Sequence, residues 1–291
     1  MMSRTKRHHF IPIGLQKNFS RDEKTLFCAR RKGDRSFDQV QGLQFKNLFV
    51  VGDLYTTYDR GRPSDALEKG LYGAVDEFLV GISREIVESV QDGRHIAFSE
   101  SHDRDLRHVF IEMIRRVPDS SPGIDAILDE QFDQTSVEVQ RRYPERASDV
   151  RSLILNQKAS DKFRQDIKAR SRAARPSVML SALQPYHFHV VTIPDEKMFL
   201  LCSNPVGRLS NGGTGHLGDE STELWLPISP HIAVVATSAL GSNTMNLKMG
   251  REFVREYNEY AAKRSSIIAS SSRKLLQSII GAVGASFSLG P

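Results

Sequence analysis

Two adjacent histidines near the start of the chain, His8 and His9, are the residues whose type and placement first suggest chemistry. A histidine side chain titrates close to neutral pH, so it can act as a general acid, a general base or a metal ligand. Pro12 lacks an N–H and biases Ile11 toward extended geometry, which predicts extended chain from His8 to Ile11. Successive side chains of an extended chain point to opposite faces. One histidine could therefore face a cleft while the other is buried or structural.

The same stretch resembles the opening signature of a known family. His8-His9-x-Ile11-Pro12, followed by Leu15, Asn18 and Phe19, is similar to the start of the DUF4238 family, a group of largely bacterial proteins without an established activity. Further segments resemble the family in the same order: residues 114–118, residues 199–206, residues 226–230 and a late helix that carries Asn258 and Arg264. The resemblance covers roughly residues 6 to 275. One position departs from it, because the family usually has Asp where this chain has Ser203, so acid chemistry is not carried over to that position.

The resemblance implies a site made from polar positions that match the family, namely His8, His9, Arg116, Ser203, Asn204 and Asn258. We expect His8, His9 and Arg116 to be catalytic, and Ser203, Asn204 and Asn258 to bind substrate. A histidine beside an arginine is typical of phosphodiester or phosphoryl chemistry, with the histidine as acid, base or metal ligand and the arginine holding the anion. Each position is expected at the edge of an element, so a histidine, Arg116 and Asn204 should approach within about 10 Å of each other. The alternative is a buried polar network that only fastens the N-terminal segment to the core.

Other chemistry is less well indicated. The sequence has no HExxH, CxxC or DxDxDG pattern, and after His9 the next histidine is His95, which is too distant for an HNH-type unit. His187 and His189 share one face of an expected strand, which suits metal ligation or, as we favour, simple surface pairing. A divalent metal assembled from distant residues stays open as a cofactor. A basic cluster, Arg164, Lys168, Arg170, Arg172 and Arg175, is expected to be a solvated helix face, with an anion-binding patch as the alternative.

Composition limits the class of protein and of partner. The 291 residues carry 40 Lys and Arg against 35 Asp and Glu, a net charge of +5, which permits nucleic acid or another phosphate-bearing ligand as partner. Only two cysteines are present, so a disulfide framework is not expected. No run of about eighteen apolar residues indicates a transmembrane helix. We expect a cytoplasmic protein with no membrane partner, and the oligomeric state is left open.

The elements that must position these residues follow an order of strands, helices, strands and helix. Strands are expected at residues 25–31 paired with 36–40, at 186–193 paired with 198–202, and at 223–226 and 232–237. Helices are expected at residues 66–90, 101–117 and 244–269, with a helical insertion at about 124–175. This order predicts an α+β fold in which an antiparallel sheet packs with long helices. We expect one domain over residues 1–275, followed by a small-residue tail, 276–291, that could fold onto the body or stay mobile.

The function expected from these features is a nuclease-like hydrolase, an intracellular effector that acts on a phosphodiester. A protein of a different class is the alternative: a non-catalytic binding or regulatory module whose histidine, arginine and asparagine set is structural.

Overall fold

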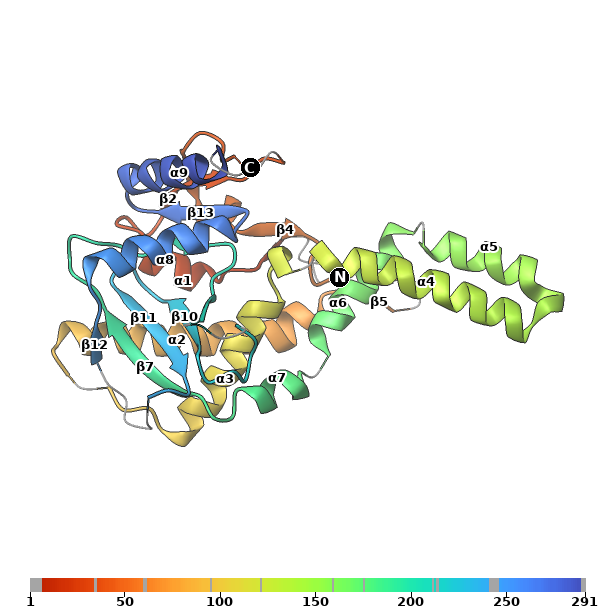
Figure 1. The fold of residues 1–291 in the computed structure, drawn as a ribbon, viewed down its shortest axis with the longest axis horizontal. Helices are drawn as coiled ribbons and strands as arrows, with labels where there is room; N and C mark the ends of the chain where they lie inside the picture. The colour runs from red at the N-terminus through yellow and green to blue at the C-terminus, as the bar shows by residue number, and fades with distance from the viewer. Residues whose placement is uncertain are drawn as a thin grey trace. The chain divides into compact units, whose positions relative to one another are not determined.

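The computed structural model describes residues 7–33, 36–59, 62–94, 96–120, 122–158, 160–174, 176–210, 212, 215–240 and 246–288 (Figure 1). The chain divides into two compact units. Unit 1 takes its residues from Met1–His8, Val51–Ala74 and Ser120–Arg175, and unit 2 from His9–Val50, Val75–Asp119 and Pro176–Pro291. The division falls within two short strands, β1 (Arg7–His9) and β4 (Val50–Gly52).

Unit 2 is built on a five-stranded sheet in the order β12-β7-β11-β10-β9. The strands are β7 (His187–Thr192), β9 (Gly207–Ser210), β10 (Thr222–Pro227), β11 (Ile232–Thr237) and β12 (Asn246–Lys248). Neighbouring strands are antiparallel, except that β12 joins β7 in parallel. Every residue of β11 is buried, because helices cover both faces of the sheet.

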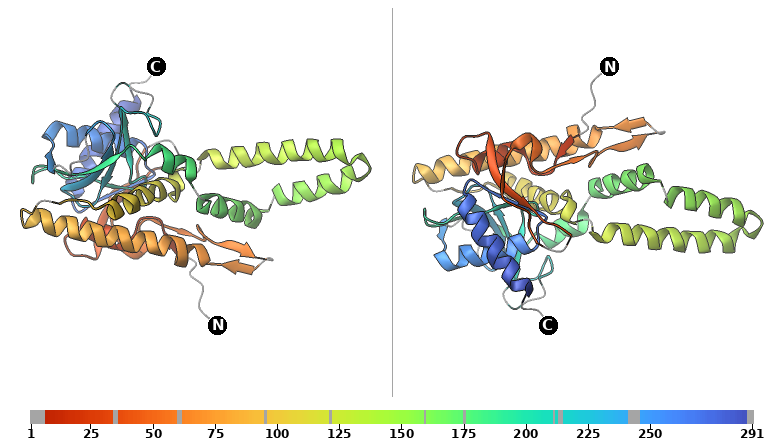
Figure 2. Two further views of the ribbon diagram at one scale, coloured as in Figure 1. Left: turned by 90° about the horizontal axis from the view of Figure 1, so that it is seen from below. Right: turned by 90° about the horizontal axis from the view of Figure 1, so that it is seen from above.

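Aromatic side chains fasten those helices to opposite faces of the sheet. On one face Phe188 of β7 contacts Phe110 of α3 (Glu100–Arg115), with ring centroids 5.4 Å apart. On the other face Trp225 of β10 packs against Phe253 and Tyr257 of α8 (Arg251–Lys263). Figure 2 shows α2 (Gly73–Gln91) and α3 on one side of this sheet and α8 on the other. A π-helical turn, Glu68–Tyr72, leads into α2.

A second sheet of unit 2 has four antiparallel strands in the order β3-β2-β13-β8. They are β2 (Thr25–Arg30), β3 (Gln41–Gln44), β8 (Leu201–Cys202) and β13 (Ile267–Ser270). The helix α9 (Arg273–Ser288) contacts β13 and β2 and buries Leu276, Ile279 and Val283. Most of the expected small-residue tail is therefore a packed helix. The short helices of unit 2 are α1 (Ile13–Asn18), α7 (Ser177–Ala182), and the 3-10 turns Phe45–Asn47 and Pro118–Ser120.

Unit 1 is mostly helical. The helices α4 (Pro122–Arg142) and α5 (Ala147–Lys158) are joined through a 3-10 turn, Pro144–Arg146, and lie side by side in both views of Figure 2. The helix α6 (Asp161–Ala173) packs against a hairpin of β5 (Thr57–Asp59) and β6 (Arg62–Ser64). Asp166 of α6 accepts a hydrogen bond of 2.6 Å from the Tyr58 N–H, which ties the helix to the hairpin.

The α+β prediction with antiparallel sheets is confirmed, and several details are corrected. The strands form two larger sheets, where one was expected. The expected helix at 244–269 is α8, which begins at Arg251 and ends at Lys263, because Asn246–Lys248 is a strand beside β7 and Ile267–Ser270 is a buried strand between β2 and β8. The partner of β7 is β11, since Leu201–Cys202 pairs with β13. The partner of β2 is Gln41–Gln44, and the expected pairing of residues 25–31 with 36–40 is present as one bridge, between Arg31 and Phe37. None of the helices in the described residues is long and apolar enough to cross a membrane.

Candidate functional site

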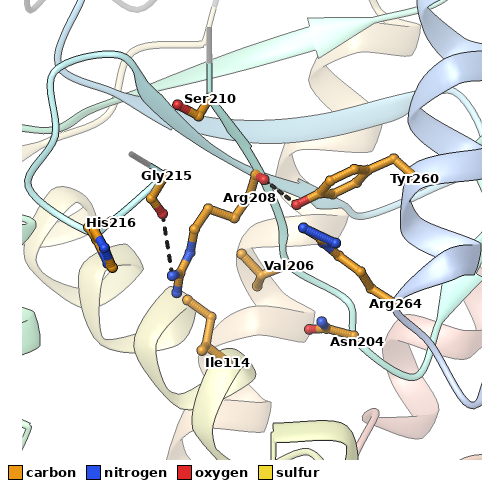
Figure 3. A pocket seen from close by; sticks show the side chains of 9 residues that line it. All are labelled: Ile114, Asn204, Val206, Arg208, Ser210, Gly215, His216, Tyr260 and Arg264. Carbon is orange, nitrogen blue, oxygen red and sulfur yellow. Dashed lines mark hydrogen bonds between the residues drawn. The ribbon is translucent and has the colours of Figure 1, made fainter. Parts of the chain in front are cut away.

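Unit 2 contains a cavity of about 520 Å³, which we call the arginine cavity (Figure 3). It is formed by the last turns of α3 and α8, the chain between β8 and β9, β9 itself and the loop that follows β9. Its lining residues are Ile114, Asn204, Val206, Arg208, Ser210, Gly215, His216, Tyr260 and Arg264. Three of these elements belong to segments that carry the family resemblance: the end of α3, the chain after β8 and the end of α8.

Backbone contacts hold Arg208 in place, and its side chain lines the cavity. In β9 it lies opposite Leu224 of β10, and its carbonyl oxygen accepts a hydrogen bond from the Tyr260 hydroxyl. The strand can approach α8 this closely because residue 207 is glycine: a Cβ there would lie 2.7 Å from the Tyr257 ring. Within the described residues, the guanidinium donates only one long hydrogen bond of 3.5 Å, to the Gly215 carbonyl, as Figure 3 shows.

Arg264 brings a second guanidinium to the same cavity. It is the C-cap residue of α8, and its backbone N–H donates to the Ala261 carbonyl. Its guanidinium lies over the Tyr260 ring, 4.4 Å from the ring centroid, so a cation–π contact orients it. In the part of the chain that the structure describes, no carboxylate forms an ion pair with Arg208 or Arg264. The cavity therefore carries two positive charges that no acidic side chain among the described residues pairs with.

Asn204 is held in position by hydrogen bonds of two serine hydroxyl groups, those of Ser203 and Ser265. The buried Ser203 hydroxyl donates to the Asp119 carboxylate and accepts from the backbone N–H of Ile267 at 3.0 Å. The Asn204 N–H donates to Ser265 Oγ at 3.3 Å. No described residue hydrogen-bonds its side-chain amide. The backbone of Asn204 is thus held in place, and its side-chain amide is available at the wall of the cavity.

His216 is the group of this cavity best able to transfer a proton near neutral pH. It is exposed in the loop between β9 and β10, and Figure 3 places it on the side of Arg208 that is opposite Arg264. The sequence analysis missed Arg208, His216 and Tyr260 as site residues. The one available signal was Arg264, which lies in a segment that resembles the family.

The two expected catalytic histidines lie in different units. His8, in unit 1, is fully buried: its Nδ1 accepts a hydrogen bond of 2.8 Å from the Tyr55 N–H, and its ring stacks on the Tyr55 ring. His9, in unit 2, is half-buried, and its Nδ1 donates to the Leu48 carbonyl at 3.2 Å. Both rings are therefore engaged in bonds that hold the N-terminal segment in place.

Arg116, expected to be an anion clamp, is sealed from solvent in unit 2. It forms an ion pair with Asp76, and the neighbouring Arg115 pairs with Glu112 at 3.1 Å. Burial raises the pKa of both the Asp76 and the Glu112 carboxyl groups, more than the adjacent arginines lower it. In this group of charges Arg116 is fully buried, whereas the Asp76 side chain keeps 29% of its surface exposed.

Asn258, expected to bind substrate, also makes internal bonds. Its side chain accepts from the Leu200 N–H at 2.9 Å and donates to the Met198 carbonyl at 2.8 Å, which ties α8 to the chain before β8. Of the expected site residues, Asn204 lines the arginine cavity. The close approach of a histidine, Arg116 and Asn204 stays a prediction.

Metal and cysteine chemistry find little support in the described part of the chain. No group of three or more His, Cys, Asp or Glu side chains there is arranged to hold a metal ion. The surface pairing expected for His187 and His189 is wrong for His189, which is fully buried. Burial raises the pKa of Cys28 to about 11 and that of Cys202 to about 12, so both stay thiols at neutral pH and are poor nucleophiles.

Three members of the basic cluster form ion pairs within unit 1. Arg164 pairs with Asp125 and Asp129, at 2.8 and 2.7 Å, and Lys168 also pairs with Asp125. Arg170 pairs with Asp166, one turn before it on α6. For these three residues the pairings favour the solvated helix face over the anion-binding patch. Arg172 is buried, so the solvated face is wrong for that residue, and Arg175 lies outside the described residues.

Comparisons with known proteins agree with the family resemblance. The model of the family described as "Protein of unknown function (DUF4238)" matches residues 7–274. No curated protein and no solved structure matches the chain. The family match includes every element that lines the arginine cavity. Because it spans nearly all of the 291 residues, the chain belongs to the DUF4238 family.

Proposed function

We propose that this protein binds a phosphate-bearing ligand in the arginine cavity and hydrolyses a phosphodiester there, as a nuclease-like enzyme. The observation that carries the proposal is the presence of Arg208 and Arg264 in one cavity without a carboxylate partner among the described residues. Arg208 is half-buried and Arg264 is exposed. Two like charges that line one cavity repel each other, so an anionic ligand is their natural complement.

The cavity suits a phosphate group in both shape and chemistry. A guanidinium offers a planar fork of N–H donors that matches the oxygens of a phosphate, and two such groups can bind one phosphate from different sides. The volume of about 520 Å³ lies within the range of small-molecule sites, roughly 300–1,000 Å³, and can hold a nucleotide-sized group. The Asn204 amide adds a donor and an acceptor at the wall.

The groups present also match the needs of hydrolysis. When water attacks the phosphorus atom, negative charge builds on the phosphate oxygens, and Arg208 and Arg264 would stabilise that charge. A proton must leave the attacking water and another must reach the departing oxygen, and His216 would serve this general acid–base role. This proposal assigns catalysis to residues that line the arginine cavity, in place of His8, His9 and Arg116.

Binding is tested by titration calorimetry of the full chain with inorganic phosphate and with a mononucleotide. We expect Arg208→Gln and Arg264→Gln each to weaken binding at least tenfold, since a hydrogen bond to a charged group is worth about 1.5–3 kcal/mol. Lys263→Gln is the matched control. Lys263 is exposed and stands beside Arg264 in the sequence, but it does not line the cavity, so removing its charge should change the affinity for phosphate less than about twofold. Equal losses in all three variants would mean that general surface charge, and not the cavity, binds phosphate.

Catalysis is tested separately, with single-stranded RNA and DNA incubated with and without divalent metal ions. We expect His216→Ala to abolish cleavage and to leave phosphate affinity within about twofold of the wild type. If the wild type binds phosphate but cleaves neither polymer, the alternative of a non-catalytic binding module is preferred. A cytoplasmic location stays a prediction.

A further inference from the structure

Unit 2 contains another cavity, of about 480 Å³, which shares no lining residue with the arginine cavity and which we call the second cavity. It is formed by the C-terminal turns of α2, the end of α1, the end of β7 and the turn between β10 and β11. Its walls are largely apolar, with Val87, Val90, Ile193, Pro230 and Ile232. A ligand in this cavity would therefore bury an apolar body.

The polar groups at this cavity include several hydrogen-bond acceptors that have no donor partner among the described residues. The Asp195 carboxylate is exposed and has no hydrogen-bond or ion-pair partner within the described residues. His231 Nδ1 is buried and likewise has no partner there, and in the Nε2–H tautomer it is an acceptor. The Asn18 amide donates its N–H to the Ile228 carbonyl at 3.0 Å, which leaves its oxygen as an acceptor.

The charge of the second cavity is opposite to that of the arginine cavity. Asp195 is the charged side chain among its described lining residues, and no lysine or arginine lies with it. An anion would meet an uncompensated carboxylate here. A cation that carries N–H donors would pair with that carboxylate.

We propose that the second cavity binds a small organic cation, a primary amine with a short apolar chain. The ammonium group pairs with the exposed Asp195 carboxylate, and the apolar chain packs between α2 and the residues around Pro230. The site is separate from the proposed phosphate site, and it draws on two segments that carry the family resemblance, those of Asn18 and of residues 226–230. The ligand is recognised by charge and by apolar contact together.

The test uses three probes of the same chain length and different head groups: hexylamine, 1-hexanol and hexanoate, each titrated into the full chain by calorimetry. We expect saturable binding of hexylamine, at least tenfold weaker binding of hexanol, and no binding of hexanoate. Hexanol binding as tightly as hexylamine, or any preference for hexanoate, overturns the proposal. So does the absence of saturable hexylamine binding.

Matched variants then locate the bound amine. Asp195→Asn keeps the shape of an exposed side chain and should weaken hexylamine binding at least tenfold. Glu88→Gln makes the same charge change on an exposed residue of α2 that does not line the cavity, and should change it less than twofold. Equal effects of both variants would overturn the proposal. Arg264→Gln should leave hexylamine affinity unchanged, so failure of the phosphate site and failure of the amine site can be told apart.

Discussion

Replacing Ser203 tests the hydroxyl network that places Asn204 at the arginine cavity. Ser203→Ala removes the donor to the Asp119 carboxylate and the acceptor for two backbone N–H groups, those of Ser266 at 2.9 Å and Ile267 at 3.0 Å. The Ser266 N–H keeps a bond of 3.1 Å to the Asp119 carboxylate, whereas the Ile267 N–H is left buried without an acceptor. A buried unsatisfied group costs about 1–3 kcal/mol, and a lost bond to a charged group adds to this, so we expect Ser203→Ala to lower the free energy of unfolding by about 2–4 kcal/mol.

The aspartate that the family usually has at this position makes the test sharper. Ser203→Asp would place a second carboxylate against that of Asp119, so we expect a larger loss of stability than with alanine. Adding Asp119→Ser to Ser203→Asp should restore much of the lost stability, because the hydroxyl introduced at position 119 can donate to the carboxylate introduced at position 203. The two backbone N–H groups then keep an acceptor. The network would have its donor and acceptor exchanged between positions 119 and 203.

Unfolding in urea, followed by far-UV circular dichroism, measures these differences for the single and double variants. Ser238→Ala is the control, because that hydroxyl makes one bond, of 3.3 Å, to the Glu220 carbonyl at the surface, and its loss should cost no more than about 0.5 kcal/mol. A loss of less than about 0.5 kcal/mol in Ser203→Ala would refute the reasoning. So would a double variant no more stable than Ser203→Asp.

Three further predictions concern single residues. His8→Ala should lower the free energy of unfolding by about 1–3 kcal/mol, since the buried Tyr55 N–H loses its acceptor, and thermal unfolding would show it. Gly207→Ala places a Cβ 2.7 Å from the Tyr257 ring, so it should displace β9 and weaken phosphate binding, measured by calorimetry. Burial raises the pKa of Glu112, so its contribution to stability is greatest below about pH 4 and is lost as the pH rises through the folded-state pKa. Glu112→Gln should therefore gain stability relative to the wild type from about pH 4 to pH 7, measured by urea unfolding.

Each of these predictions has a matched control. His9→Ala removes a half-buried ring bonded to one carbonyl and should cost less than His8→Ala. Gly42→Ala adds a Cβ that meets only the Phe27 ring, at 3.9 Å, so phosphate binding should be unchanged. Glu85→Gln neutralises an exposed carboxylate of α2 and should show no growing advantage with pH. A control that behaves like its test variant would contradict the corresponding explanation.

Local patterns in the sequence predicted α2, α3, the helical segment at about 124–175 and the strands β2, β7, β10 and β11, whereas the short strands β3, β9 and β12 were not predicted. The apolar positions of α2 and α3 recur at helical spacing, and the strands β7, β10 and β11 are rich in branched and aromatic residues. The segment Ile267–Ser270 was predicted as helix because four residues are too few to show a period, and it follows a true helix directly. Its strand conformation comes from partners far away in the chain, β2 and β8.

The candidate site also depends partly on local sequence patterns and partly on long-range contacts. Residue types and short spacings are local properties, so the segments that carry polar family positions can be recognised without knowledge of the fold. Tertiary structure alone decided which of those side chains remain available: His8, Arg116 and Asn258 make internal bonds, whereas Asn204 lines a cavity. It also brought Arg208 and Arg264 together, since a strand and a helix end meet only when the sheet packs on α8. Whether a polar group is buried with a partner or presented to a ligand depends on these long-range contacts, which no local pattern encodes.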